Sequence, residues 1–259
     1  MGLLDNLLSL IGLGPTVPMR DLAMGDPQAK QFVSEVQRAN FSGVDAVVSQ
    51  MKDGAWDDRD FLLEVVAEVA LAKLPAADQI FDAWCKNQPT SSVAHLLKAR
   101  HAMLSAWQAR GGGTSDTVGD EGERLFGERL QVAEQAFLQA ADLEPQDPTP
   151  WAHMIHVRMC GLGGDVNLGL GLFGEVTQRD PLHRSGHMQL IAGLAHKWSG
   201  AGHEPMFQFA RNVVATAPEG SDVAMTIAMA HVERWVWDYL FKEDEAAAEL
   251  YLQDSKNQA

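Results

Sequence analysis

The stretch QVAEQAFLQAADLEP, residues 131–145, is the clearest indicator of the fold. Ala133, Phe137 and Ala140 follow one another at intervals of four and three, and Pro145 comes five residues later. Residues at these intervals lie on one face of an α-helix, so the stretch carries a small–large–small apolar stripe. The proline ends the pattern because its ring cannot continue a helix. The stretch is therefore predicted to be the second helix of a packed helix pair.

The same stripe recurs before three other prolines. The prolines are Pro89, Pro145, Pro181 and Pro218, separated by 56, 36 and 37 residues. The matching triplets are Ala77, Phe81 and Trp84, then Gly169, Phe173 and Val176, then Met206, Ala210 and Val213. The first separation is long because it contains a glycine-rich insertion, residues 111–122, which lacks the Gly-Lys-Ser/Thr of a phosphate-binding loop. The repeat predicts stacked helix pairs.

This period resembles that of the tetratricopeptide-like helical repeat proteins over about residues 59–216. The predicted first helices lack a clear Trp-Leu-Gly-Tyr pattern, which indicates an irregular stack. The resemblance implies an all-α fold, an irregular TPR-like α-α superhelix built from helical hairpins. A shorter stretch, HKWSGAGHEPMFQFAR at 196–211, resembles a bacterial family of helical-repeat proteins of unknown function through its Trp-x-Gly turn and Met-x-x-Phe-Ala-Arg. That second resemblance implies no activity.

Caps and apolar periodicity place the remaining helices and the domains. The expected ranges are 27–39, 44–51, 59–73, 75–88, 92–110, 147–160, 165–179, 183–198, 204–216, 221–241 and 243–253. The first two helices are expected to join near residues 41–43. Asp57 or Asp58 is expected to cap the third helix, with Phe61 and Ala72 among its inward residues. Residues 1–27 form a predicted N-terminal helix and connector, and residues 28–259 a repeat domain with a C-terminal cap from about 221.

The N-terminal segment 2–11 has one apolar face, formed by Leu3, Leu4, Leu7, Leu8 and Ile11. A helix of this pattern is predicted to pack on the body of the protein. A membrane-surface anchor and a dimer contact are the alternatives, and the absence of Lys and Arg from the segment disfavours the anchor.

The aromatic stretch 226–241 allows two interpretations. It is core if the acidic helix after it caps the stack, and a partner-binding patch if that helix lies elsewhere. The capping requirement of a repeat array favours the core.

Composition limits the classes of partner. The formal net charge is −15, which disfavours nucleic acid and anionic membranes, because phosphate binding needs clustered Lys and Arg. An acidic surface suits a basic partner and also favours solubility. No run of 18 apolar residues is present, so no transmembrane segment is expected. Cys85 and Cys160 are predicted to be buried structural thiols, which fits a reducing compartment and a cytoplasmic protein.

The leading functional hypothesis is a non-enzymatic scaffold that binds a protein or peptide on the concave face of its first helices. No hydrolase or zinc-protease motif is present, so neither a catalytic residue nor a cofactor is predicted. The groove residues expected on first helices are Arg100, His101, Trp151, His153, His156, Arg158, His187 and Gln189.

Two alternatives stay open at this point. Histidines three or four apart share a helical face, so His153, His156, His183 and His187 could bind a metal or a small ligand. The chain could also be a structural subunit that self-associates through its N-terminal helix. The sequence does not determine the oligomeric state.

Overall fold

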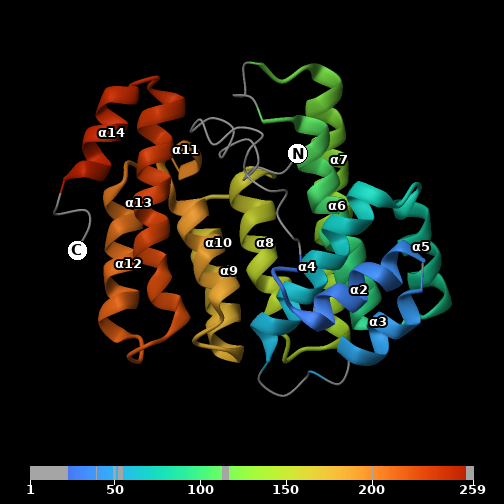
Figure 1. The fold of residues 1–259 in the computed structure, drawn as a ribbon. Coiled ribbons are helices and arrows are strands. Elements are labelled where there is room, and N and C mark those ends of the chain that lie inside the picture. Colours follow the sequence, from blue (N-terminus) through green and yellow to red (C-terminus); the bar gives the residue numbers. More distant parts are fainter. Residues whose placement is uncertain are drawn as a thin grey trace. The chain divides into compact units, whose positions relative to one another are not determined.

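A computed structural model of the chain describes residues 23–38, 40–48, 51, 55–112, 117–199 and 201–254 (Figure 1). This part of the chain is helical and has no strand, so the all-α prediction is confirmed. The predicted N-terminal helix 2–11 lies outside the described residues. None of the described helices has both the length and the apolar content that crossing a bilayer requires. The chain divides into two compact units, residues 1–150 and 151–259, and each is described by itself.

The first unit is organised around one long helix. Its helices are α2 (Pro27–Gln37), α3 (Phe41–Val48), α4 (Trp56–Lys73), α5 (Ala77–Asn87), α6 (Ser92–Arg110) and α7 (Asp120–Leu143). Helix α6 packs against α3, α4, α5 and α7, and α2 packs against α3 and α4. The contact between α4 and α6 joins two helices that are separated in the sequence by α5.

The apolar stripes lie where the sequence predicts them. Ala133, Phe137 and Ala140 of α7 are buried, as are Phe81 and Trp84 of α5. Burial of Phe, Leu or Val side chains stabilises a fold by about 1.5–3 kcal/mol each, so these stripes are a main source of helix packing energy.

Some local predictions need correction. Residues 41–43 belong to α3 and do not form the joint. Helix α4 begins at Trp56, so Asp57 and Asp58 lie in its first turn, where carboxylates favour the helix dipole without capping it. Ala72 is exposed and Phe61 is half-buried. Because α4 packs against both α2 and α6, its buried face is broader than a single stripe.

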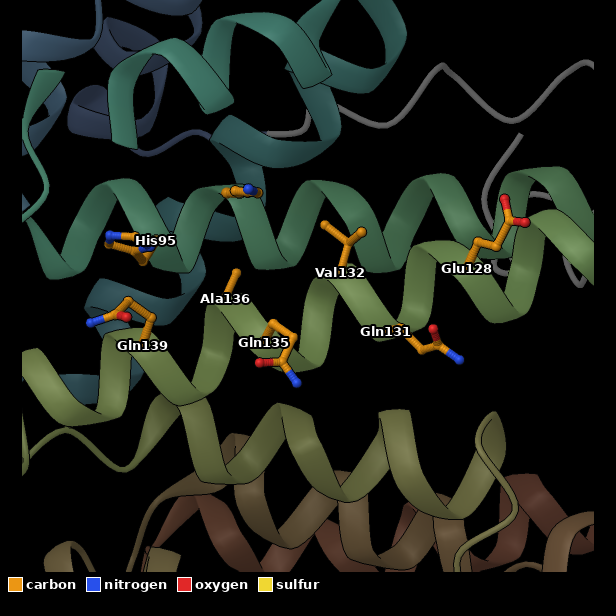
Figure 2. Close-up of a pocket in the computed structure, with 8 residues that line it drawn as sticks. His95, Glu128, Gln131, Val132, Gln135, Ala136 and Gln139 are labelled. Atoms are coloured by element: carbon orange, nitrogen blue, oxygen red, sulfur yellow. The ribbon is translucent and has the colours of Figure 1, made fainter. Parts of the chain in front are cut away.

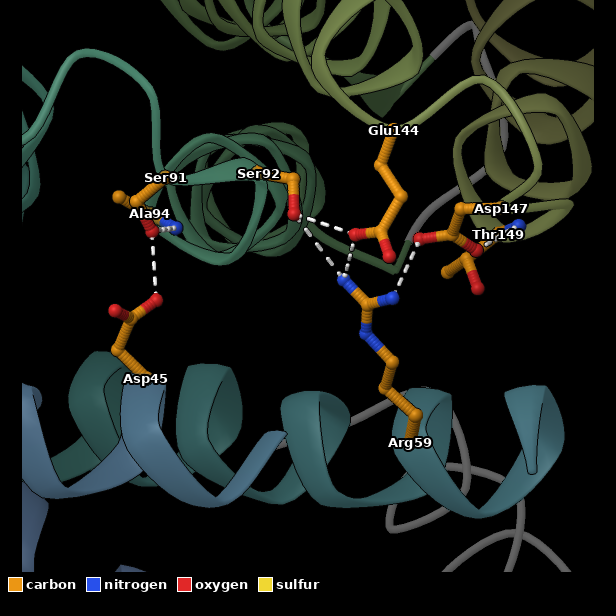
Figure 3. A network of polar contacts seen from close by, with 8 residues as sticks. All are labelled: Asp45, Arg59, Ser91, Ser92, Ala94, Glu144, Asp147 and Thr149. Carbon is orange, nitrogen blue, oxygen red and sulfur yellow. Dashed lines mark hydrogen bonds and ion pairs between the residues drawn. The ribbon is translucent and has the colours of Figure 1, made fainter. Parts of the chain in front are cut away.

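A buried polar network ties distant parts of the first unit together (Figure 3). Arg59 is fully buried in α4, and its guanidinium lies 2.9 Å from a carboxylate oxygen of Glu144 and 3.3 Å from one of Asp147. Ser92, at the start of α6, donates a hydrogen bond of 2.6 Å to Glu144. The Asp147 carboxylate also accepts a hydrogen bond from the main-chain N–H of Thr149, the first residue of the next helix. The network joins α4 and α6 to the turn that follows α7.

The second unit contains shorter and more irregular helices. Helix α8 (Thr149–Cys160) begins at the boundary and is followed by α9 (Val166–Arg179), α10 (Arg184–Leu194), α11 (His196–Ser199), α12 (Glu204–Thr216), the 3-10 helix η2 (Asp222–Met225), α13 (Thr226–Val236), the π-helical turn η3 (Trp237–Phe241) and α14 (Glu245–Gln253). Helix α10 packs against α9, α12 and α13. The predicted continuous helices 183–198 and 221–241 are therefore wrong in detail, since the first breaks at Ala195 and the second changes helix type twice.

Three glycines of the second unit allow side chains of neighbouring helices to approach. A Cβ added at Gly169 or Gly193 would lie 2.0 or 2.6 Å from Sδ of Met159, so this methionine occupies space that both glycines leave. A Cβ at Gly186 would lie 2.6 Å from Cγ1 of Val176. The first position of the predicted stripe is therefore occupied by glycine at residue 169 because Met159 fills the space that a larger side chain would need.

Helix α14 covers part of the aromatic stretch at the C-terminal end. It packs against α13 and η3, and His231 and Tyr251 are joined by a hydrogen bond of 2.6 Å. Stacked ring pairs form between Trp235 and Tyr239 and between Trp237 and Phe241. Helix α14 therefore covers part of the stretch, while Phe241 stays 42% exposed.

Candidate functional site

A groove with a volume of about 580 Å³ lies on α6 and α7 of the first unit (Figure 2). It is lined by His95 and Lys98 of α6 and by Glu128, Gln131, Val132, Gln135, Ala136 and Gln139 of α7. We call it the amide groove, because three glutamines dominate its lining.

The glutamines are arranged with helical regularity. Gln131, Gln135 and Gln139 are all exposed and follow one another at intervals of four residues. Val132 and Ala136 lie on the edge of α7 that faces α6, as Figure 2 shows, and Gln131 and Gln135 lie on its other edge. Val132 is 44% exposed, so the groove combines an apolar floor with a row of primary amides.

The groove follows directly from how α7 is built. One face of α7 carries the buried stripe of Ala133, Phe137 and Ala140, which anchors the helix to the core. The glutamines occupy a different face of the same turns, so burial of the stripe fixes their direction. The row therefore stands on a rigid helix and not on a loop.

His95 contributes a polar atom without a partner to the groove. Its Nε2 is buried and makes no hydrogen bond within the described part of the chain. Burial lowers the pKa of His95, so its ring is neutral at pH 7 and this nitrogen can donate or accept, depending on the tautomer.

A smaller pocket of about 190 Å³ opens beside the amide groove and shares Lys98 and Val132 with it. Its other lining residues are Asp78, Phe81, Asp82, His101, Ala102, Ser105 and Arg129, contributed by α5, α6 and α7. We call it the side pocket.

Most charges of the side pocket are already paired. Lys98 lies 2.7 Å from Asp82, and Nδ1 of His101 lies 2.9 Å from Asp78. Burial lowers the pKa of His101 more than the Asp78 carboxylate raises it, so the ring is mainly neutral at pH 7. Arg129 differs, because its guanidinium donates a hydrogen bond of 2.7 Å to the main-chain carbonyl of Ser105 and pairs with no carboxylate of the described chain.

Of the two groove residues predicted in the first unit, one lines a cavity. His101 forms part of the side pocket. Arg100 is buried and lies 3.4 Å from the carboxylate of Glu64. The sequence pattern did not single out the glutamines, although their spacing of four is visible in QVAEQAFLQ, the stretch that indicates the fold.

The predicted groove residues of the second unit have varied surroundings. The guanidinium of Arg179 lies 4.9 Å from the ring centre of the half-buried Trp151. His153 and His187 are buried, and the ring of His187 packs edge-on against Phe173 at 4.9 Å. The other predicted residues, His156, Arg158 and Gln189, are half-buried.

The four-histidine set is not gathered into a metal site. Within the described residues, no three His, Cys, Asp or Glu side chains come together as metal ligation requires. Nδ1 of His183 accepts the N–H of Gly186 at the start of α10, and Nδ1 of His187 bonds the carbonyl of His183. Both rings therefore hydrogen-bond main-chain groups at the start of α10.

The two cysteines are free and buried, as the sequence predicts. Burial raises the pKa of the Cys160 thiol to about 12 and also raises that of Cys85. Thiols in such surroundings are poor nucleophiles, so neither is a candidate for catalysis.

The chain was also compared with known proteins. No protein-family model matches the chain, and no significant match was found among curated proteins or solved structures.

Proposed function

We propose that the protein is a non-enzymatic binding module that holds an extended segment of another polypeptide in the amide groove. The observation that carries this proposal is the row of Gln131, Gln135 and Gln139 beside the apolar residues Val132 and Ala136 in the lining of one groove. A primary amide both donates and accepts hydrogen bonds, so it pairs equally well with the N–H or the C=O of a main chain. Recognition of this kind does not depend on the partner's side chains.

The spacing of the row supports an extended partner. Four residues of α-helix rise about 6 Å, and two residues of an extended chain span about 6.6 Å. Successive glutamines can therefore meet every second residue of a strand-like segment lying along α7. The alternate side chains of that segment would face the apolar floor at Val132 and Ala136. The tetratricopeptide-like period of the sequence agrees with a binding role.

Peptide selection tests the proposal directly. The purified full chain is panned against a display library of random 12-residue peptides, and the affinity of enriched peptides is measured by fluorescence anisotropy. In the groove variant, Gln131, Gln135 and Gln139 are all replaced by alanine. We expect the groove variant to bind at least about tenfold more weakly, because each lost hydrogen bond is worth about 0.5–1.5 kcal/mol.

A matched control separates the groove from a general loss of amides. The control variant replaces the exposed Gln108, Gln178 and Gln208, which do not line the groove, by alanine. It should bind as the unmodified chain does. Equal binding by the groove variant and the unmodified chain would contradict the proposal.

A further inference from the structure

The side pocket holds two hydrogen-bond donors whose capacity the fold does not use. Ser105 is 5% exposed, and its hydroxyl has no hydrogen-bond partner within the described chain. Leaving a buried hydroxyl unpaired costs about 1–3 kcal/mol, so a group that the pocket receives from outside would relieve that cost.

Arg129 is the second donor. A guanidinium carries five N–H donors, and one of them is engaged with the carbonyl of Ser105. This bond holds the guanidinium next to Ser105. The remaining N–H groups of the guanidinium can still donate hydrogen bonds to a ligand. The planar fork of a guanidinium matches the two oxygens of a carboxylate.

Neither carboxylate of the pocket forms an ion pair with Arg129. Lys98 pairs with Asp82, and the mainly neutral ring of His101 bonds Asp78. Arg129 is therefore a half-buried cation, beside an unpaired hydroxyl, that faces a cavity and forms no direct ion pair within the described chain.

We propose that the side pocket binds the carboxylate of an acidic side chain, Asp or Glu, carried by the segment in the amide groove. This inference rests on the proposed peptide-binding function. The pocket volume of about 190 Å³ equals roughly six waters at about 30 Å³ each, which is room for one side chain and little more. Lys98 and Val132 line both cavities. A side chain of a segment bound in the groove can therefore enter the pocket while the main chain of that segment stays in the groove.

The test synthesises the peptides that the same selection enriches in two forms, one acetylated and amidated, so that side chains are its only carboxylates, and one with a free C-terminus. Enriched peptides should share one acidic position. Replacing that residue by its amide, Glu by Gln or Asp by Asn, should weaken binding to the unmodified chain about tenfold. Against Arg129→Gln the same replacement should cause little further loss, because the partner of the carboxylate is already absent.

Ser105→Ala provides a variant that does not endanger the fold. Its hydroxyl makes no hydrogen bond to any described residue, so its removal should leave the unfolding midpoint unchanged or raised, while the acidic peptide binds several-fold more weakly. Arg124→Gln is the matched control for Arg129, since Arg124 also lies on α7 but is exposed and pairs with Glu121 and Glu128. It should not alter binding.

Three results would overturn the inference. They are enrichment of Lys or Arg in place of acidic residues, equal affinity of the acid and amide peptides, and binding that appears only when the peptide has a free C-terminal carboxylate. If such peptides still depend on the three glutamines, the groove proposal survives and only the side-pocket inference fails.

Discussion

Arg59 and Glu144, 85 positions apart in the sequence, form a buried ion pair with 2.9 Å between guanidinium nitrogen and carboxylate oxygen (Figure 3). Asp147 lies on the other side of the same guanidinium at 3.3 Å. One cation therefore compensates two carboxylates in a site without water contact on the arginine. Removing that cation would leave two buried acids opposite each other.

Replacing Arg59 by methionine should destabilise the first unit by about 3–5 kcal/mol, the usual result of leaving a buried charge without its partner. Urea unfolding measures the total loss, and hydrogen exchange should show faster exchange in α4 and α7. The control is Arg124→Met, which breaks only exposed ion pairs and should have a much smaller effect. Similar losses for the two variants would mean that the Arg59 network contributes no more than a surface pair.

Close helix packing in the second unit predicts opposite effects for two glycine substitutions. Gly186→Ala adds a methyl 2.6 Å from Cγ1 of Val176, whose branched side chain is stiff, and overpacking of this kind costs about 1–3 kcal/mol. Gly174→Ala, on α9, meets no atom within 4 Å and should stabilise the helix by up to about 1 kcal/mol. Thermal unfolding should therefore show a lower midpoint for the first variant and a higher one for the second. An increase for both would contradict the packing at Gly186.

His203 makes stability depend on pH. Burial, followed by the charges of Arg234 and His196, lowers the pKa of His203 to about 4, from 6.5 in an unfolded chain. Between these values the unfolded state binds more protons than the folded state, so stability is complete above about pH 6.5 and falls as the pH approaches 4. His203→Gln should flatten the decline of the unfolding midpoint over this range. Asp238 and Lys242 also act on the ring, with opposite signs, and both stay in place in this variant. An unchanged slope would show that other groups cause the decline.

Tyr251 holds the last helix in place through its hydroxyl. Tyr251→Phe removes the hydrogen bond to His231 and keeps the ring that lies under Arg234. We expect a loss of about 0.5–1.5 kcal/mol, the net value of one hydrogen bond. Hydrogen exchange should accelerate in α14 and stay unchanged in α9, whereas uniform acceleration would indicate a global effect.

The cysteines should resist alkylation in the folded protein. Cys160 is buried and has a pKa of about 12, so almost no thiolate exists at pH 8. Iodoacetamide followed by mass spectrometry should label neither Cys160 nor Cys85 in the native chain and both of them in urea. Rapid native labelling of Cys160 would show that the second unit opens easily.

Neighbouring residues alone specify the helical class and the inward stripes. Ala133, Phe137 and Ala140 are separated by whole helical turns, and such spacing can bury an apolar face only in a helix. The observed N-caps of two helices are equally local, since Ser91 and Asp165 accept hydrogen bonds from N–H groups three residues ahead. Short-range geometry of this kind is fully contained in neighbouring residues.

Which polar residues meet depends instead on how the helices pack. Arg129 of α7 bonds Ser105 of the neighbouring α6, and Arg59 bonds Glu144, which is distant in the sequence. These residues meet because the packing of the apolar stripes fixes the rotation of each helix about its axis. Local sequence patterns likewise do not contain the contacts between helices. They therefore do not predict the break at Ala195, the changes of helix type in residues 221–241 or the division into two units. The glutamine row depends on both the local sequence and the helix packing. Its period was present in the sequence, and its place beside a groove came from the packing of α7 on α6.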